Sequence, residues 1–161
     1  MDLKNEPALG DLIFVHGTGP ISRAIEWAEN GPYSHVALYA GRDRVLEAQD
    51  NRKSGYAPLS KYEGVYDIGQ VRGVTNMQRM EAVAFARRHI GARYAWGAIL
   101  VLALKLLLHL QIPYKQRLHE FICSFYVADA WSFAGKVLTN EPNPTPQDLA
   151  NSPEINIVRP T

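Results

Sequence analysis

Two β-rich runs around a short polar turn constrain the fold of this 161-residue chain more than any other feature. The first run, SHVALYA, covers residues 34–40, and the second, VLEAQ, covers residues 45–49. The turn GRDR at 41–44 separates them, and runs of this kind around a Gly/Asp turn predict an antiparallel β-hairpin. His35 and Glu47, two side chains suited to acid–base chemistry, then lie on neighbouring strands.

The other apolar patterns predict an α+β fold. Short apolar runs indicate strands, and apolar residues at helical spacing with capping residues indicate helices. The expected strands cover 12–15, 65–71 and 155–158, and the expected helices cover 20–29, 76–90, 94–110 and 123–134, with one helical turn at 147–150. Residues 50–64, which carry charges, glycines and a proline, are expected to form an exposed excursion. We therefore expect a small antiparallel sheet packed by three to four helices, in a single domain covering residues 1–161.

Composition excludes several classes of site and partner. Cys123 is the single cysteine, which excludes an intramolecular disulfide and zinc sites built from several cysteines. There is no HExxH spacing and no Gly-rich phosphate loop, so we expect no metal and no other cofactor. The net charge is +1 with acids and bases interspersed, which argues against a nucleic-acid partner. Residues 1–7 lack an apolar signal-peptide region, and a lone cysteine suits a reducing compartment, so we expect a cytoplasmic location.

One apolar segment, Ala98 to Leu110, has the sequence AILVLALKLLLHL. A helix that spans a bilayer needs about 20 apolar residues, so this segment is too short to cross a membrane. It is either a helix buried on all sides, or a helix that lies on a membrane or covers an apolar substrate groove. In the second case it would be a peripheral membrane contact, with Leu106, Leu107 and Leu110 exposed.

Cys123 lies where a helix is expected to begin. The free N–H groups and dipole at a helix start favour a thiolate, although an unpaired cysteine is more often a packing residue. A thiol hydrolase also needs an imidazole that moves the proton and a group that orients this imidazole. Of the five histidines, His35 is the best base because it begins a strand next to small Ser34, although a strand histidine is more often structural. His16 lies in a loop after a strand and is a candidate for the wall of the site.

Glu47 is the candidate for the orienting group, because it interrupts an apolar run on the returning strand. A half-buried carboxylate there needs a partner, whereas an exposed strand glutamate does not. Side chains alternate between the two faces of a strand, so His35 and Glu47 share a face only if the loop has an odd number of residues. A loop at 40–42 places them opposite each other, and a loop at 40–44 makes them diagonal neighbours. A two-residue turn at 42–43 would put them on opposite faces.

Short motifs follow one another along nearly the whole chain. They are GDLIF at 10–14, SHVALYAG at 34–41, VLEA at 45–48, GARY at 91–94, CS at 123–124 and TPQDLA at 145–150. In this order they resemble the permuted papain-like hydrolases of the NlpC superfamily, in its YiiX/YebB-like branch. The order His, acid, Cys is that of the permuted branch, and the twelve-residue spacing of His35 and Glu47 is also similar to the superfamily's. Many relatives have His or Asn where this chain has Glu47.

The resemblance implies a circularly permuted papain-like fold and a role for each matched residue. Cys123 would be the nucleophile, His35 the base and then the acid, and Glu47 the orienting group. The backbone N–H groups of Cys123 and Ser124 would hold the oxyanion, and Tyr94 would line the cleft. We expect Cys123 Sγ to lie about 3–4.5 Å from one ring nitrogen of His35, and the other nitrogen to donate a hydrogen bond to Glu47.

Three functions are compatible with these residues. The one we expect is a cysteine hydrolase that cleaves an amide of a peptide or a peptidoglycan-like substrate through an acyl-enzyme. The second is an acyltransferase or lipase that acts on lipids at a membrane through a thioester, since lecithin–retinol acyltransferases resemble the same branch. The third is a binding module that keeps the fold without catalysis. The sequence predicts no particular oligomeric state.

Overall fold

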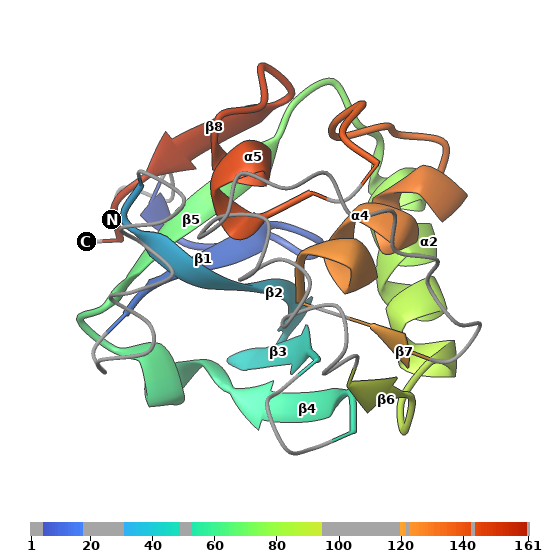
Figure 1. The fold of residues 1–161 in the computed structure, drawn as a ribbon, viewed down its shortest axis with the longest axis horizontal. Coiled ribbons are helices and arrows are strands. Elements are labelled where there is room, and N and C mark those ends of the chain that lie inside the picture. The colour runs from blue at the N-terminus through green and yellow to red at the C-terminus, as the bar shows by residue number, and fades with distance from the viewer. Residues whose placement is uncertain are drawn as a thin grey trace, which may run out of the picture.

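A six-stranded sheet forms the centre of the molecule, with its strands in the order β4-β3-β2-β1-β5-β8 (Figure 1). The computed structural model describes residues 5–17, 31–48, 53–94, 120–121, 123–142 and 144–160. The strands of the sheet are β1 (Leu12–His16), β2 (Tyr33–Gly41), β3 (Arg44–Glu47), β4 (Gly55–Pro58), β5 (Tyr66–Val71) and β8 (Ile155–Val158), and each pairs antiparallel with its neighbours. The described helices are the 3₁₀-helix η2 (Leu59–Tyr62) and the α-helices α2 (Asn76–Arg88), α4 (Cys123–Phe133) and α5 (Pro146–Ala150). A separate short parallel pair joins β6 (Arg93–Tyr94) to β7 (Glu120–Phe121).

This architecture confirms the α+β class and the antiparallel sheet packed by helices. The strands expected at 12–15, 65–71 and 155–158 are present, and β8 lies at an edge of the sheet. The expected helix starts at 76 and 123 and the helical turn near 147 are also present. The helices expected at 20–29 and over Ala98 to Leu110 lie outside the described residues. No helix within the described part of the chain is long and apolar enough to cross a membrane.

Alternate residues of the central strands face two different apolar clusters. Leu12 and Phe14 of β1 pack with buried side chains of α2 and α4, whereas Ile13 and Val15 pack with residues of η2. This alternation is the two-residue period expected of a strand that is buried on both faces. The three described α-helices therefore lie over one face of the sheet (Figure 1), and η2 packs against the other.

The β2–β3 hairpin combines a two-residue turn with a bulge. Arg42 and Asp43 both have positive φ, of 54° and 51°, as a tight hairpin turn requires. Of the loops considered from the sequence, the one at 40–44 matches the register, because Tyr39 pairs with Val45 across these residues. The two-residue turn at 42–43 is also present, but it does not separate His35 and Glu47 as expected. Tyr39 pairs with Val45 but Gly41 pairs with Arg44, so one extra residue is inserted on β2. The extra residue restores the parity of the strands, and His35 and Glu47 share a face as diagonal neighbours.

Residues 53–64 form part of the sheet and core, which corrects the expectation of an exposed excursion at 50–64. Strand β4 pairs with β3 at the edge of the sheet, where glycine and proline are tolerated. The following turn, η2, buries Leu59 and Tyr62 against the sheet. The three-residue spacing of these two apolar residues was the signal for this turn, and the charges around it masked the signal.

Two buried hydrogen bonds, from Tyr126 and Trp131, hold helix α4 in place. The Trp131 indole donates to the carbonyl of Gly10 (3.1 Å), at the start of the sheet. The Tyr126 hydroxyl donates to the carbonyl of Ala86 (2.6 Å), on α2. Because both side chains are fully buried, these bonds orient α4 relative to the sheet and to α2. They therefore also position its first residue, Cys123.

Asp11 and Arg79 form a buried ion pair between the start of β1 and α2. Arg79 Nη1 lies 2.6 Å from Asp11 Oδ1 and 2.9 Å from the carbonyl of Leu9. The backbone N–H of Ala8 donates to the other Asp11 oxygen (2.9 Å). The Asp11 side chain is almost fully buried, so its charge depends on these donors.

We expect Arg79→Met to lower the free energy of unfolding by about 3–5 kcal/mol, because it leaves a buried carboxylate without its cation. Arg72→Met is the matched control, since Arg72 makes an exposed contact with Asn156, and its effect should stay within about 0.5 kcal/mol. Urea unfolding measures both. Equal stability of the two variants would mean that backbone donors satisfy Asp11.

Candidate active site

His35 and Glu47 form a hydrogen-bonded pair between β2 and β3. His35 Nε2 lies 2.9 Å from Glu47 Oε2, and the two side chains are 20% and 1% exposed. A carboxylate only accepts hydrogen bonds, so Nε2 carries the proton in this pair. The predicted contact between the two residues is therefore confirmed. The other ring nitrogen, Nδ1, is left to exchange a proton with another group.

Glu47 also binds two residues of η2 that the sequence did not predict. The Tyr62 hydroxyl donates to Oε2, the oxygen that His35 contacts, and Lys61 Nζ donates to Oε1 (3.1 Å). Lys61 also donates to the Tyr62 hydroxyl (3.1 Å), so the three side chains form one network around the carboxylate. Donors on both oxygens are what a carboxylate needs to remain ionised when it is buried.

Cys123 is the first residue of α4 and is 7% exposed. The first N–H groups of a helix have no acceptor within the helix, and together with the dipole they favour negative charge at this position. The predicted place of the cysteine at a helix start is confirmed. Its predicted distance from His35 stays a prediction.

Tyr62 links the cysteine to the His35–Glu47 pair. Burial raises the pKa of the Tyr62 hydroxyl above its ordinary value, and the charge of Cys123 raises it further. The same hydroxyl donates to Glu47, and the Tyr62 ring lies 5.9 Å from the His35 ring, centroid to centroid. A thiolate at the start of α4 would therefore act on the Tyr62 hydroxyl, which belongs to the network on β2, β3 and η2.

Ser124 and Tyr94 both lie close in sequence or in pairing to the start of α4. The buried Ser124 hydroxyl donates to the carbonyl of Pro144 (2.6 Å), so it ties α4 to the segment before α5. Its backbone N–H remains a predicted oxyanion donor. Tyr94 lies in β6, which corrects its expected place in a helix, and it pairs with Phe121, two residues before Cys123. Its backbone runs beside the chain that enters α4, while its side chain lies outside the described residues.

His16 takes part in a second histidine–carboxylate pair. It is the last residue of β1 rather than a loop residue, and its Nε2 lies 3.1 Å from Asp67 Oδ2. The Tyr33 hydroxyl donates to the same oxygen (2.7 Å). Burial, and then the Asp67 carboxylate, raise the pKa of Tyr33 above its ordinary value. The sequence did not single out Asp67 or Tyr33, because neither belongs to a recognisable motif.

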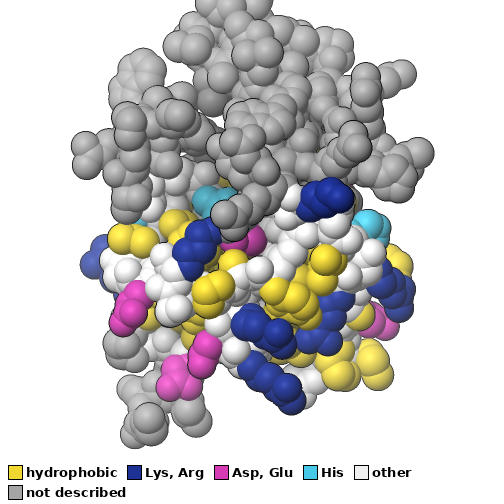
Figure 2. All heavy atoms as spheres, turned by 90° about the horizontal axis from the view of Figure 1, so that it is seen from below, with side chains coloured by type: hydrophobic (Ala, Val, Ile, Leu, Met, Phe, Trp, Pro, Cys, Tyr) yellow, Lys and Arg dark blue, Asp and Glu magenta, His cyan; other side chains and the backbone are white. Residues whose placement is uncertain are grey.

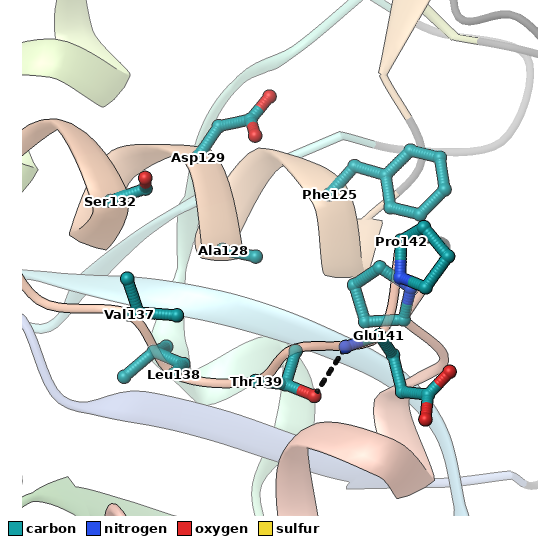
Figure 3. Close-up of a pocket in the computed structure, with 10 residues that line it drawn as sticks. Phe125, Ala128, Asp129, Ser132, Val137, Leu138, Thr139, Glu141 and Pro142 are labelled. Atoms are coloured by element: carbon teal, nitrogen blue, oxygen red, sulfur yellow. Dashed lines mark hydrogen bonds between the residues drawn. The ribbon is translucent and has the colours of Figure 1, made fainter.

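A pocket beside α4 lies apart from Cys123, His35 and Glu47. Figure 3 shows it between α4 and the segment 137–144, with the side chains of Phe125, Asp129 and Ser132 along the helix. Its volume is about 150 Å³, and its lining residues include none of the proposed triad. The Asp129 carboxyl beside it has a raised pKa because of burial. This pocket therefore gives the triad no substrate cleft.

Among the described residues, no three His, Cys, Asp or Glu side chains gather as they would around a metal ion. The two histidine–carboxylate pairs offer only two such ligands each.

Comparisons with known proteins find a similarity of fold. No family model matches the chain, and no curated protein matches it in sequence. Among solved structures, the chain is similar to the metalloprotein YiiX from Escherichia coli O157:H7, with a TM-score of 0.74 and 19% identity. The match covers 96% of this chain and 98% of YiiX. The two chains therefore share their fold over nearly their whole lengths.

We expect His35→Ala to slow the labelling of Cys123 by iodoacetamide at neutral pH by about tenfold or more. An unassisted thiol is only a few per cent thiolate at pH 7, whereas a thiol paired with an imidazolium is largely ionised. His89→Ala is the control, because His89 Nδ1 donates to the carbonyl of Phe85 on α2. Mass spectrometry of Cys123 against time measures the rates, and equal rates in the two variants would exclude His35 as its partner.

Proposed function

We propose that this protein is a cysteine hydrolase with a permuted papain-like fold of the NlpC type, in which Cys123, His35 and Glu47 form the catalytic triad. The observation that carries the proposal is the His35–Glu47 hydrogen bond of 2.9 Å, which engages Nε2 and leaves Nδ1 for the thiol. The start of α4 at Cys123 and the YiiX-like fold support it. The substrate is an amide of a peptide or a peptidoglycan-like chain.

Each bond change has a group to carry it out. Cys123 gives its proton to His35 Nδ1, and the thiolate attacks the amide carbon while the carbonyl electron pair moves onto oxygen. Backbone N–H groups of Cys123 and Ser124 stabilise that oxyanion. When the oxyanion collapses, the C–N bond breaks and Nδ1 protonates the leaving amine. Water then gives a proton to Nδ1 and attacks the thioester, which releases the acid and returns the thiolate.

Glu47 acts through His35 in this scheme. By accepting from Nε2, it fixes the tautomer with its lone pair on Nδ1, and it stabilises the ring when Nδ1 is protonated. A reducing compartment such as the cytoplasm would keep the thiol available for this chemistry.

We expect Glu47→Gln to keep the fold and to lower turnover on the order of 100-fold or more, since the amide can hold the ring but not its charge. Glu154→Gln is the matched control, because Glu154 pairs with Lys136 on the surface. A panel of cell-wall peptides and phospholipids, with and without a chelator, measures turnover. Unchanged activity of Glu47→Gln would mean that Glu47 is not the group that orients His35. Gln49, which lies outside the described residues, would then be the next candidate. Loss of wild-type activity with the chelator would favour metal chemistry, which the name of YiiX suggests for that protein.

One observation favours the alternative of a lipid substrate. Figure 2 shows Lys and Arg side chains gathered beside hydrophobic side chains on the face seen from below. Cationic and apolar groups on one face bind anionic membrane surfaces. A thioester on Cys123 could then carry an acyl chain from a phospholipid to an acceptor.

If lipids are the substrate, we expect the protein to float with phosphatidylcholine vesicles that contain phosphatidylserine, and to be released by high salt because the attraction is electrostatic. Vesicles of phosphatidylcholine alone are the control. No binding to either vesicle, together with cleavage of a cell-wall peptide, would leave the amidase. If neither substrate turns over and Cys123 labels slowly with or without His35, the protein is a binding module.

A further inference from the structure

The two oxygens of the Glu47 carboxylate accept hydrogen bonds from two different basic side chains, His35 and Lys61. On Oε2 it accepts from His35, the ring whose protonated form it would stabilise. On Oε1 it accepts from the Lys61 ammonium at 3.1 Å. An anion paired with a cation exerts a much weaker field on a third group than the anion alone. The electrostatic field at the His35 ring is therefore that of the Glu47–Lys61 ion pair, and not that of an isolated carboxylate.

Lys61 is held at this position by more than one contact. Its Nζ donates to Glu47 and to the Tyr62 hydroxyl, each at 3.1 Å, and it lies 4.8 Å from the centroid of the Tyr62 ring. The Lys61 side chain is 42% exposed, so the ammonium is anchored by Glu47 while part of the stem reaches water. Without the carboxylate, the flexible side chain would be free to relax into solvent.

We propose that Lys61 is a positioning residue which offsets the charge of Glu47 and so limits how strongly the His35 imidazolium is stabilised. The inference rests on the proposed function, in which His35 must give up its proton to the leaving amine. An imidazolium held only by a buried carboxylate would be a poor acid, because proton loss would leave the carboxylate uncompensated. By offsetting the carboxylate charge, Lys61 would make it easier for the imidazolium to give its proton to the leaving amine.

The titratable groups that face the network come from four elements. They are His35 on β2, Glu47 on β3, Lys61 and Tyr62 on η2, and Cys123 at the start of α4, whose charge acts on Tyr62. Burial lowers the pKa of Lys61 and raises that of Tyr62. Tyr62 therefore stays a neutral hydrogen-bond donor at neutral pH.

The test is an NMR titration of the His35 ring in a Cys123→Ala background, which removes coupling to the thiol. We expect Lys61→Met to raise the pH at which the ring loses its proton by roughly half to one unit, because the cation that opposes the imidazolium is gone. Lys61→Arg keeps the charge and should restore the original midpoint. Lys136→Met, which breaks the Lys–Glu pair on the surface, should leave the midpoint unchanged.

A double variant shows whether Lys61 acts through Glu47. With Glu47→Gln, Lys61 has lost its ionic partner, so a further Lys61→Met change should move the midpoint by much less than in the Glu47 protein. A Lys61→Met protein that is less stable but titrates like its parent would overturn the proposal. So would a full shift in the Glu47→Gln background.

The failure of this proposal is distinguishable from the failure of the proposed function. Labelling of Cys123 that does not depend on His35 would exclude the triad, whatever the midpoint of the His35 titration. Labelling that depends on His35, with no shift in Lys61→Met, would sink only the role of Lys61. With an active substrate in hand, Lys61→Met should also move the alkaline limb of kcat/KM to higher pH, in step with the ring.

Discussion

The burial of the Glu47 carboxylate is the interaction on which the arrangement of the site depends. A carboxylate that is 1% exposed is stable only with donors around it, and these come from β2 and from both final residues of η2. To bring them together, β2 must carry an extra residue before its turn, and η2 must fold under the sheet. The local geometry of β2, β3 and η2 therefore depends on one buried charge. A neutral apolar residue at position 47 would remove the hydrogen bonds that join these three segments.

Much of the fold was predictable because it follows from short-range patterns. Helix α2, for example, starts at residue 76 as expected, behind a capping box formed by Thr75 and Gln78, and apolar runs located β1 and β5. The bulge on β2 was not singled out, since it lies in the pairing of β2 with β3 beside the turn, and the strand pattern of either segment does not mark it. Parity reasoning from the two-residue turn alone therefore excluded too much, although the loop at 40–44 and the predicted contact were right.

Some residues of the candidate site could also be predicted from the sequence, and others could not. His35, Glu47 and Cys123 could be singled out because each interrupts or begins a regular element, where a polar side chain needs a reason. Lys61 and Tyr62 could not, because a lysine and a tyrosine in a charged, Gly- and Pro-containing stretch read as solvated residues. Their role exists only once η2 brings them under β3. Contacts of this kind are set by tertiary packing, and no spacing in the sequence encodes them.

The two histidine–carboxylate pairs of the sheet also explain which imidazole suits the thiol. Both use Nε2 against a carboxylate oxygen that also accepts a tyrosine hydroxyl, from Tyr62 in one pair and Tyr33 in the other. Cys123 acts on the pKa of Tyr62, whereas Asp67 and Arg159 are the charges that act on Tyr33. A charge at Cys123 therefore acts on the tyrosine of the His35 pair, whereas the charges that act on Tyr33 lie in other parts of the chain. This difference is the reason to propose His35, and not His16, as the partner of the thiol.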